Sequence, residues 1–256
     1  MNPEIESFQK LWNGGYMEGD PLDPLGHSGY GGFGYLSSLH ATYLRCIKPY
    51  VRPDTVALEL GPGRGTWTRS MLKAREIWCL DALPESHNRF YEHIGPAPHV
   101  NYVHVEDFEC TALPEQHFTY MFSYGCLCHV SFDGIRQYAI NLHSKLRPDA
   151  ECFWMVADYR KYNAAMEDAA KLNIYVRAFP NRSILRPIRK IVGAFAARKA
   201  RQLIKPLDEK PAPSPGRWFD AGIERTCEML EKTGYRIVDA DTGVNVRDPV
   251  IHFVRR

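Results

Sequence analysis

The sequence has no long hydrophobic run and almost no net charge. Its 256 residues include 32 Lys and Arg and 30 Asp and Glu, which gives a formal net charge of +2 at pH 7. A charge balance so close to neutral gives no global reason to expect nucleic-acid binding. No apolar run approaches the length of a membrane span, and the first ten residues, MNPEIESFQK, lack the apolar core of a signal peptide. We therefore expect a cytoplasmic protein that does not bind nucleic acid.

Paired cysteines are also missing. The seven cysteines are scattered, odd in number and mostly inside apolar runs, a pattern typical of reduced, buried thiols. Only Cys126 and Cys128 are close together, and no second pair completes a zinc site. We expect both to form part of the core or of a pocket wall. The length allows one substantial core, or one domain with an insertion.

The most specific pattern is a glycine-rich loop that follows an apolar, strand-like run at residues 55–68, TVALELGPGRGTWT. Gly61, Gly63 and Gly65 allow the backbone to turn tightly and to approach a ligand closely. Glu59 lies two residues before the first glycine, at the end of the predicted strand, where open α/β sheets bind their ligands. The spacing differs from the dinucleotide pattern G-x-G-x-x-G, so a dinucleotide is not predicted.

A second apolar run, IWCLD at residues 77–81, ends in Asp81 about twenty residues beyond the glycines. In nucleotide-binding α/β sheets an acid at this position bonds ribose hydroxyls. The two oxygens of a carboxylate match the 2′ and 3′ hydroxyls. The alternative is that Asp81 only caps a helix that starts near Pro84.

Together, these two patterns resemble the first motifs of class I S-adenosylmethionine-dependent methyltransferases. The resemblance covers about three quarters of the chain and is strongest over residues 55–107. It implies a Rossmann-like, seven-stranded, mostly parallel sheet with helices on both faces and a C-terminal antiparallel hairpin. It also implies S-adenosyl-L-methionine as the cofactor, bound by Glu59, Gly61, Gly63, Gly65, Asp81, Ala82, Asp107, Phe108 and Tyr124.

Within the resemblance, Asp107 follows the third predicted strand and is expected to contact the adenine amino group, with Phe108 against the ring. The alternative for Asp107 is a solvent-exposed turn. Many family members have an acid near the start of the fourth strand, where this chain has Thr119 and Tyr120. That departure removes one of the usual cofactor contacts.

Methyl transfer to a hydroxyl needs a group that removes its proton. His129 is the first candidate base because it follows the fourth predicted strand and its side chain titrates near neutrality. Asp158, after the fifth strand, is the second, and Tyr124 is a candidate for orienting the acceptor. For His129, the alternative is a structural or substrate-positioning role. A divalent metal is not favoured, because only Asp158, Asp133 and His129 are within plausible reach of one another.

The chain divides into three regions by composition. Residues 1–50 are rich in glycine and aromatics and are expected to cap the cofactor, whereas residues 51–159 and 218–256 form the methyltransferase core. Residues 160–217 interrupt the strand–helix alternation, and residues 182–205 within them contain eight Lys and Arg and no acid. This insertion is expected to be a lid or a docking surface for an anionic or membrane-attached substrate. The alternative is a solvated helix face.

The chain also resembles bacterial sugar and small-molecule O-methyltransferases, and this resemblance, with the aromatic N-terminal region and the basic insertion, implies O-methylation of a sugar, glycan or glycosylated metabolite. The alternatives are N- or O-methylation of a lipid or another small metabolite, and cofactor binding without catalysis. The candidate substrate contacts are Tyr30, Tyr159, Arg182 and Arg186. The sequence allows peripheral membrane contact through the basic insertion and does not predict the oligomeric state.

Overall fold

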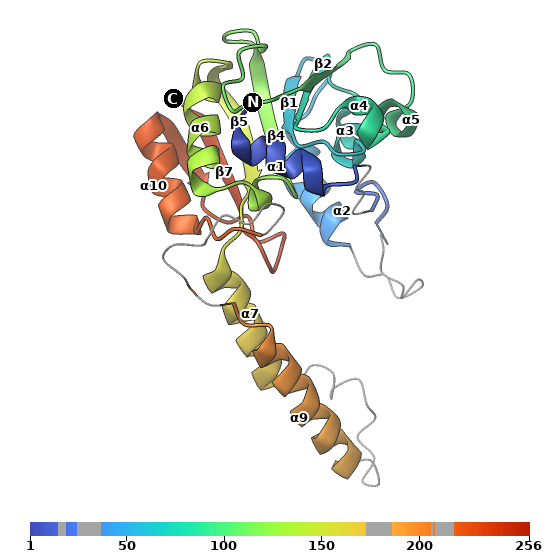
Figure 1. Ribbon diagram of the computed structural model, residues 1–256, viewed down its shortest axis with the longest axis vertical. Coiled ribbons are helices and arrows are strands. Elements are labelled where there is room, and N and C mark those ends of the chain that lie inside the picture. Colours follow the sequence, from blue (N-terminus) through green and yellow to red (C-terminus); the bar gives the residue numbers. More distant parts are fainter. Residues whose placement is uncertain (15–18, 25–36, 173–185, 206, 208–217) are drawn as a thin grey trace.

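The structure is a computed structural model that describes residues 1–14, 19–24, 37–172, 186–205, 207 and 218–256. Its centre is a seven-stranded sheet of order β3-β2-β1-β4-β5-β7-β6 (Figure 1). The strands are β1 (Val56–Leu60), β2 (Glu76–Asp81), β3 (Val100–His104), β4 (Phe118–Ser123), β5 (Leu146–Met155), β6 (Tyr235–Asp239) and β7 (Val250–Arg255). Strands β1 to β5 pair in parallel, while β7 is antiparallel to both β5 and β6. This confirms the predicted Rossmann-like fold with its C-terminal antiparallel hairpin.

Helices cover both faces of the sheet (Figure 1). They are α1 (Pro3–Leu11), α2 (Ser38–Thr42), the π-helix η1 (Tyr43–Ile47), α3 (Thr66–Met71), α4 (Glu85–Asn88), α5 (Phe90–Ile94), the 3₁₀ turn η2 (Leu127–His129), α6 (Phe132–His143), α7 (Tyr159–Leu172), α9 (Arg186–Gln202) and α10 (Ile223–Thr233). All five residues of β1 are buried, as expected for a parallel strand with both faces covered.

Two apolar clusters fill the space on either side of the sheet. Leu58 and Leu60 of β1 belong to one cluster and Ala57 to the other, because successive side chains of a strand point to opposite faces. Residues of α6 and α10 complete the first cluster, and residues of η1, α3 and α5 complete the second. The two-sided core fixes the carboxyl ends of the parallel strands, where the candidate site lies.

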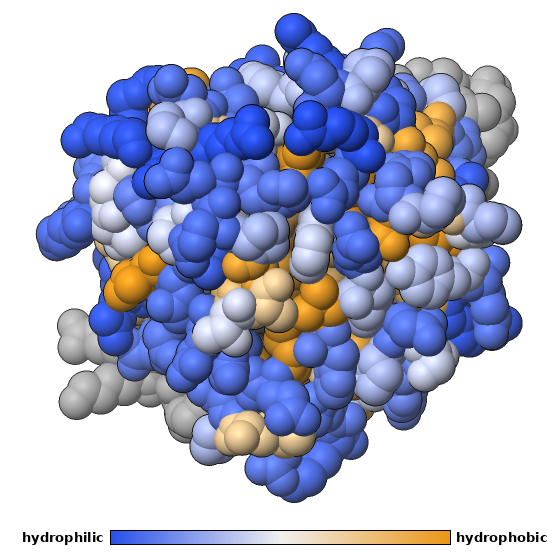
Figure 2. Space-filling model, turned by 90° about the horizontal axis from the view of Figure 1, so that it is seen from above, coloured by the Kyte–Doolittle hydropathy of each residue, from blue (hydrophilic) through white to orange (hydrophobic). Residues whose placement is uncertain are grey.

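All seven cysteines are free thiols, and five of them are buried. Cys128 lies in the core, whereas Cys126 is half-buried. Seen from above, most of the molecular surface is hydrophilic, and hydrophobic residues are visible near the centre of the view and in groups towards its upper right and left (Figure 2).

Helices α7 and α9 form an antiparallel pair that projects away from the sheet and its covering helices (Figure 1). The pair is joined at its base by two hydrogen bonds of 2.8 Å: the Asn163 amide donates to the Lys205 carbonyl, and the Lys205 N–H donates to Asn163 Oδ1. Among the helices in the described ranges, none is long and apolar enough to cross a membrane.

Candidate functional site

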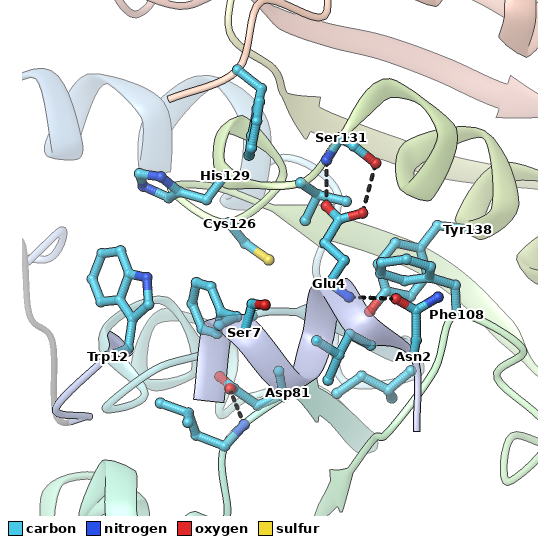
Figure 3. Close-up of a pocket in the computed structure, with 18 of the residues that line it drawn as sticks. Asn2, Glu4, Ser7, Trp12, Asp81, Phe108, Cys126, His129, Ser131 and Tyr138 are labelled. Atoms are coloured by element: carbon cyan, nitrogen blue, oxygen red, sulfur yellow. Dashed lines mark hydrogen bonds between the residues drawn. The ribbon is translucent and has the colours of Figure 1, made fainter. Parts of the chain in front are cut away.

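A cavity of about 830 Å³ lies at the carboxyl ends of β1, β2 and β4. Its walls come from the loop after β1, the end of β2, the η2–α6 segment, helix α1 and the segment that leads into α10 (Figure 3). The volume falls in the upper part of the range of about 300–1,000 Å³ that is usual for small-molecule sites. The cavity therefore has room for a cofactor and a small acceptor.

The glycines of the loop after β1 have different structural roles. Gly61 and Gly63 line the cavity and have φ values of 68° and 53°. A Cβ on Gly61 would lie 2.3 Å from Cys126 Cβ, so only glycine fits there. Gly65 is not among the cavity-lining residues. A Cβ there would meet Ile94 Cγ2 at 2.4 Å, so this glycine instead permits close packing of α3 against α5.

Asp81 lines the cavity at the end of β2, next to Ala82. Its Oδ2 accepts the Gly63 N–H at 3.1 Å, and its Oδ1 accepts the Leu83 N–H at 2.9 Å. Burial raises the pKa of the Asp81 carboxyl, and these two backbone hydrogen bonds oppose the rise. Helix α4 begins at Glu85 with Pro84 as its N-cap and has no side-chain cap. The alternative role of Asp81 as a helix cap is therefore wrong.

Glu59 differs from the prediction of a cofactor contact. Its side chain points into the core, where Oε2 accepts the Thr68 hydroxyl at 2.6 Å and the Cys79 thiol at 3.8 Å. It is not among the residues that line the cavity. Burial raises the pKa of the Glu59 carboxyl to about 8. Through these hydrogen bonds, Glu59 links β1 to α3 and β2 inside the core.

Of the two residues expected beside adenine, only Phe108 lines the cavity. Its buried ring meets the Tyr138 ring edge-on, with 4.9 Å between the ring centroids. The Asp107 carboxylate instead accepts the Glu109 N–H at 2.9 Å in a local turn. Asp107 therefore matches the alternative of a turn residue.

Three further candidates lie outside the cavity lining. Tyr124 packs on Trp67 in the cluster on the α3 side of the sheet, with 4.8 Å between ring centroids. Asp158 is buried, and its two oxygens accept the N–H groups of Lys161 and Ile223, both at 2.8 Å. The Tyr159 hydroxyl donates to the Trp218 carbonyl. These residues were predicted at the site because they follow strands in the sequence. In the structure their side chains point into the protein and not into the cavity.

His129 lines the cavity, and its ring meets the ring of Trp12 edge-on with 5.2 Å between centroids (Figure 3). The turn η2 fixes this position, because the His129 N–H donates to the Cys126 carbonyl at 2.9 Å. The candidate substrate residues Tyr30 and Arg182 lie outside the described residues. Arg186 is the first residue of α9, in the projecting helix pair.

Helix α1 forms a wall of the cavity. It lies within residues 1–50, which were expected to cap the cofactor, but a helix at residues 3–11 was not predicted. Its Glu4 carboxylate accepts both the N–H and the hydroxyl of Ser131, at 2.6 and 2.7 Å (Figure 3). The Gln9 side chain donates to the Ala82 carbonyl at 2.7 Å. A local signal for this helix exists: Asn2 caps it by accepting the Glu4 N–H, and Pro3 occupies the first turn.

Within the described part of the chain, no group of three or more His, Cys, Asp and Glu side chains is arranged to hold a metal ion. Polar groups at the end of the cavity near α10 are Asp133, Asp220 and Arg225. The Arg225 guanidinium lies over the Phe132 ring, 4.1 Å from its centroid.

Residues 57–149 match the family model described as a methyltransferase domain. The matched segment contains the glycine loop, Asp81 and the turn that carries His129. This part of the chain is therefore similar to a methyltransferase domain. A search of the curated proteins found no match to the sequence.

Solved structures of S-adenosylmethionine-dependent methyltransferases share the fold. One from Listeria monocytogenes, described as putative, has a TM-score of 0.55 at 13% identity and covers 86% of this chain and 96% of its own. One from Mesorhizobium loti has a TM-score of 0.52 at 17% identity, with coverage of 86% and 98%. An N-methyltransferase from Bradyrhizobium japonicum, solved with S-adenosyl-L-homocysteine, has a TM-score of 0.52 at 13% identity, with coverage of 84% and 85%. The chain thus has the fold of class I S-adenosylmethionine-dependent methyltransferases.

Proposed function

We propose that this methyltransferase domain transfers a methyl group from S-adenosyl-L-methionine to a hydroxyl of a small polar acceptor, most simply a sugar or a glycosylated metabolite. The observation that carries the proposal is a single cavity lined both by the glycine loop with Asp81 and by His129. The first group suits an adenosyl cofactor, and the second suits a proton acceptor.

The residues of the cofactor half fit the adenosyl group chemically. Gly61 and Gly63 present backbone without side chains, and a Cβ at Gly61 would clash with Cys126. The Asp81 carboxylate lines the cavity and would accept hydrogen bonds from the ribose hydroxyls. Phe108 offers an apolar wall for the adenine ring. When bound, S-adenosyl-L-methionine supplies an electrophilic methyl group.

The acceptor half combines aromatic and polar side chains. Trp12, Phe132 and Phe219 supply apolar faces, while Asp133 and Asp220 supply oxygens that accept hydrogen bonds from hydroxyl groups. This mixture suits a polyhydroxylated ring, which has apolar faces and a polar rim. His129 would accept the proton of the hydroxyl that is methylated.

A second candidate is methylation of an amine on a small metabolite. The carboxylates of Asp133 and Asp220 in the cavity wall favour this, because they would attract a cationic acceptor. His129 would then remove the proton of the ammonium group before transfer.

Calorimetry with S-adenosyl-L-methionine and S-adenosyl-L-homocysteine tests the cofactor half. We expect Asp81→Asn to weaken binding by about 1.5–3 kcal/mol, because hydrogen bonds to a charged group are lost. Asp107→Asn is the matched control, since Asp107 lies outside the cavity lining. Unchanged affinity in Asp81→Asn would remove the ribose assignment.

A screen with radiolabelled methyl donor tests the acceptor half, using sugars in one arm and small amines in the other. Label on sugars alone supports O-methylation, and label on amines alone supports the second candidate. Cofactor binding without transfer to any acceptor would indicate a binding module. With an acceptor found, His129→Ala is expected to lower kcat by about 10²–10⁴-fold while leaving the affinity for S-adenosyl-L-homocysteine unchanged. Normal turnover in this variant would exclude His129 as the base.

A further inference from the structure

Two of the side chains that the structure describes on α9 are large, apolar and exposed. Ile191 and Phe195 are one helical turn apart, and 70% and 71% of their surfaces are exposed. Residues four apart on a helix lie on the same face, so the two side chains are neighbours. Single exposed apolar residues are common on protein surfaces, but an adjacent exposed pair on a projecting helix is not explained by packing.

The opposite face of the same helix carries small side chains that pack against α7. Gly193 is buried and Ala197, one turn later, is half-buried, on the side where α9 packs against α7. Residue 195 is rotated by about 200° from residue 193 around a helix of 3.6 residues per turn. The Ile191–Phe195 pair therefore points away from α7. Helix α9 therefore has one side packed against α7 and exposed apolar side chains on the opposite side.

Positive charge lies next to the exposed pair, on its C-terminal side. Helix α9 contains six Lys and Arg residues and no Asp or Glu. Arg198 and Lys199 follow Phe195 by three and four residues and are exposed, as is Arg201. The exposed acids of the pair, Glu167 and Asp168, belong to α7, which packs against the opposite side of α9. A helix surface that combines exposed apolar side chains with neighbouring cations is the pattern of a helix that lies at a membrane interface.

We propose that the outward face of α9, formed by Ile191, Phe195, Arg198 and Lys199, docks on an anionic lipid membrane. Ile191 and Phe195 enter the boundary between headgroups and acyl chains, and the cations pair with anionic headgroups. The two apolar side chains that the structure describes on this face are too small an area for a stable protein interface on their own. Nucleic acid would satisfy the charges, but would leave the apolar centre uncovered. This inference does not depend on the identity of the methyl acceptor.

Docking through the α7–α9 pair would bring the cavity close to the membrane, because of where the pair leaves the domain. Strand β5 ends at Met155 and α7 begins at Tyr159, so the pair leaves the domain at the edge of the sheet that holds the cavity. Docking through α9 would tether that edge near the lipid surface. The α9 face would then be a membrane-binding site that is separate from the cavity.

Cosedimentation of the full chain with vesicles tests the proposal. The probes are vesicles of phosphatidylcholine alone and of phosphatidylcholine mixed with phosphatidylglycerol. We expect binding to the mixed vesicles only, weakening as salt is added. Phe195→Ser and the double change Arg198→Glu, Lys199→Glu should each weaken binding by about tenfold or more, whereas Phe195→Trp should preserve it.

Two exposed residues of the domain body provide matched controls. Val246→Ser removes an apolar side chain that is 74% exposed, and Arg52→Glu reverses an exposed charge. Both should bind mixed vesicles like the unmodified protein. Circular dichroism and the affinity for S-adenosyl-L-homocysteine will show whether each variant is folded.

Three results would overturn the proposal. The first is absence of binding to mixed vesicles, or equal binding to both kinds of vesicle. The second is a dimer in light scattering that Phe195→Ser converts to a monomer, which would assign the face to a second copy of the chain. The third is salt-dependent binding to RNA that Phe195→Ser leaves unchanged, in the absence of vesicle binding.

Discussion

At the residue scale, the most unusual group is the carboxyl of Glu59. The sequence motif predicted it to contact the cofactor, but in the structure it is buried in the core. Glu59 is 1% exposed and accepts hydrogen bonds from Thr68 and Cys79. Burial disfavours the charged form, which is why the pKa of Glu59 is raised from 4.5 to about 8. The proton held by this carboxyl links the stability of the protein to pH.

The sign of that link follows from the two pKa values. Below about pH 4.5 the carboxyl is protonated in both the folded and the unfolded chain, so it has no effect. As the pH rises towards 8, the unfolded chain loses the proton and the folded protein keeps it. Stability therefore falls with rising pH across this window, and the loss is complete above about pH 8.

We expect Glu59→Gln to flatten this dependence, because the amide keeps an acceptor for Thr68 and cannot ionise. The variant should gain in Tm relative to the unmodified protein as the pH is raised, with the largest gain near about pH 9. Thermal unfolding monitored by circular dichroism over the pH series measures the difference. Asp107→Asn, in an ordinary surface turn, is the control. Parallel curves for Glu59→Gln and the unmodified protein would contradict the assignment.

At the element scale, helix α1 decides the shape of the cavity. One end of the helix is tied to the start of α6 by the two Glu4–Ser131 hydrogen bonds, and the other to the end of β2 by Gln9. Its backbone is also joined to the rest of the domain, because the Asn2 N–H donates to the Glu106 carbonyl at 2.7 Å. These contacts cross from the N-terminus to three separate segments, so the cavity is closed by a piece of chain outside the matched family segment.

We expect Glu4→Gln to weaken binding of S-adenosyl-L-homocysteine by about 1.5–3 kcal/mol, because a neutral amide holds the two Ser131 donors less well than a carboxylate does. Calorimetry measures the affinity, and hydrogen exchange of the α1 amides measures the loosening. Glu6→Gln is the control on the same helix, since Glu6 is exposed and pairs only with Lys10. Equal losses in both variants would point to a general effect on the helix.

At the scale of the whole molecule, the chain consists of a methyltransferase body and a projecting α7–α9 pair (Figure 1). The cavity lies entirely in the body, and no residue of the pair is among those that line it. Ligand binding should therefore stabilise the body without ordering the pair. A lid, the other role considered for the basic insertion, would behave in the opposite way.

We expect saturating S-adenosyl-L-homocysteine to raise Tm, since a ligand at 100 times its Kd adds about 2.7 kcal/mol to folding stability. Hydrogen-exchange mass spectrometry should show protection in α1 and in the loops after β1 and β2. The α9 amides should exchange at the same rate with and without ligand. Protection of α9 would show instead that the pair closes over the cavity.

The sequence by itself determined the mostly parallel sheet, the glycine loop, Asp81 and the position of His129 after the fourth strand. These features are local: a buried strand, a glycine bend and a following acid each follow from residues near one another in the chain. The C-terminal hairpin was also predicted, because the family resemblance extends to residues 250–254, which the structure places in β7.

Only the tertiary structure decided which side chains face the cavity. Glu59, Tyr124 and Asp158 lie near strand ends, but the packing turns them into the core or uses them to cap helices. Helix α1 reaches the cavity through a contact between residues 4 and 131, a separation that no local pattern reports. Side-chain direction and long-range contact depend on how the layers pack, and that is settled only when the whole chain has folded.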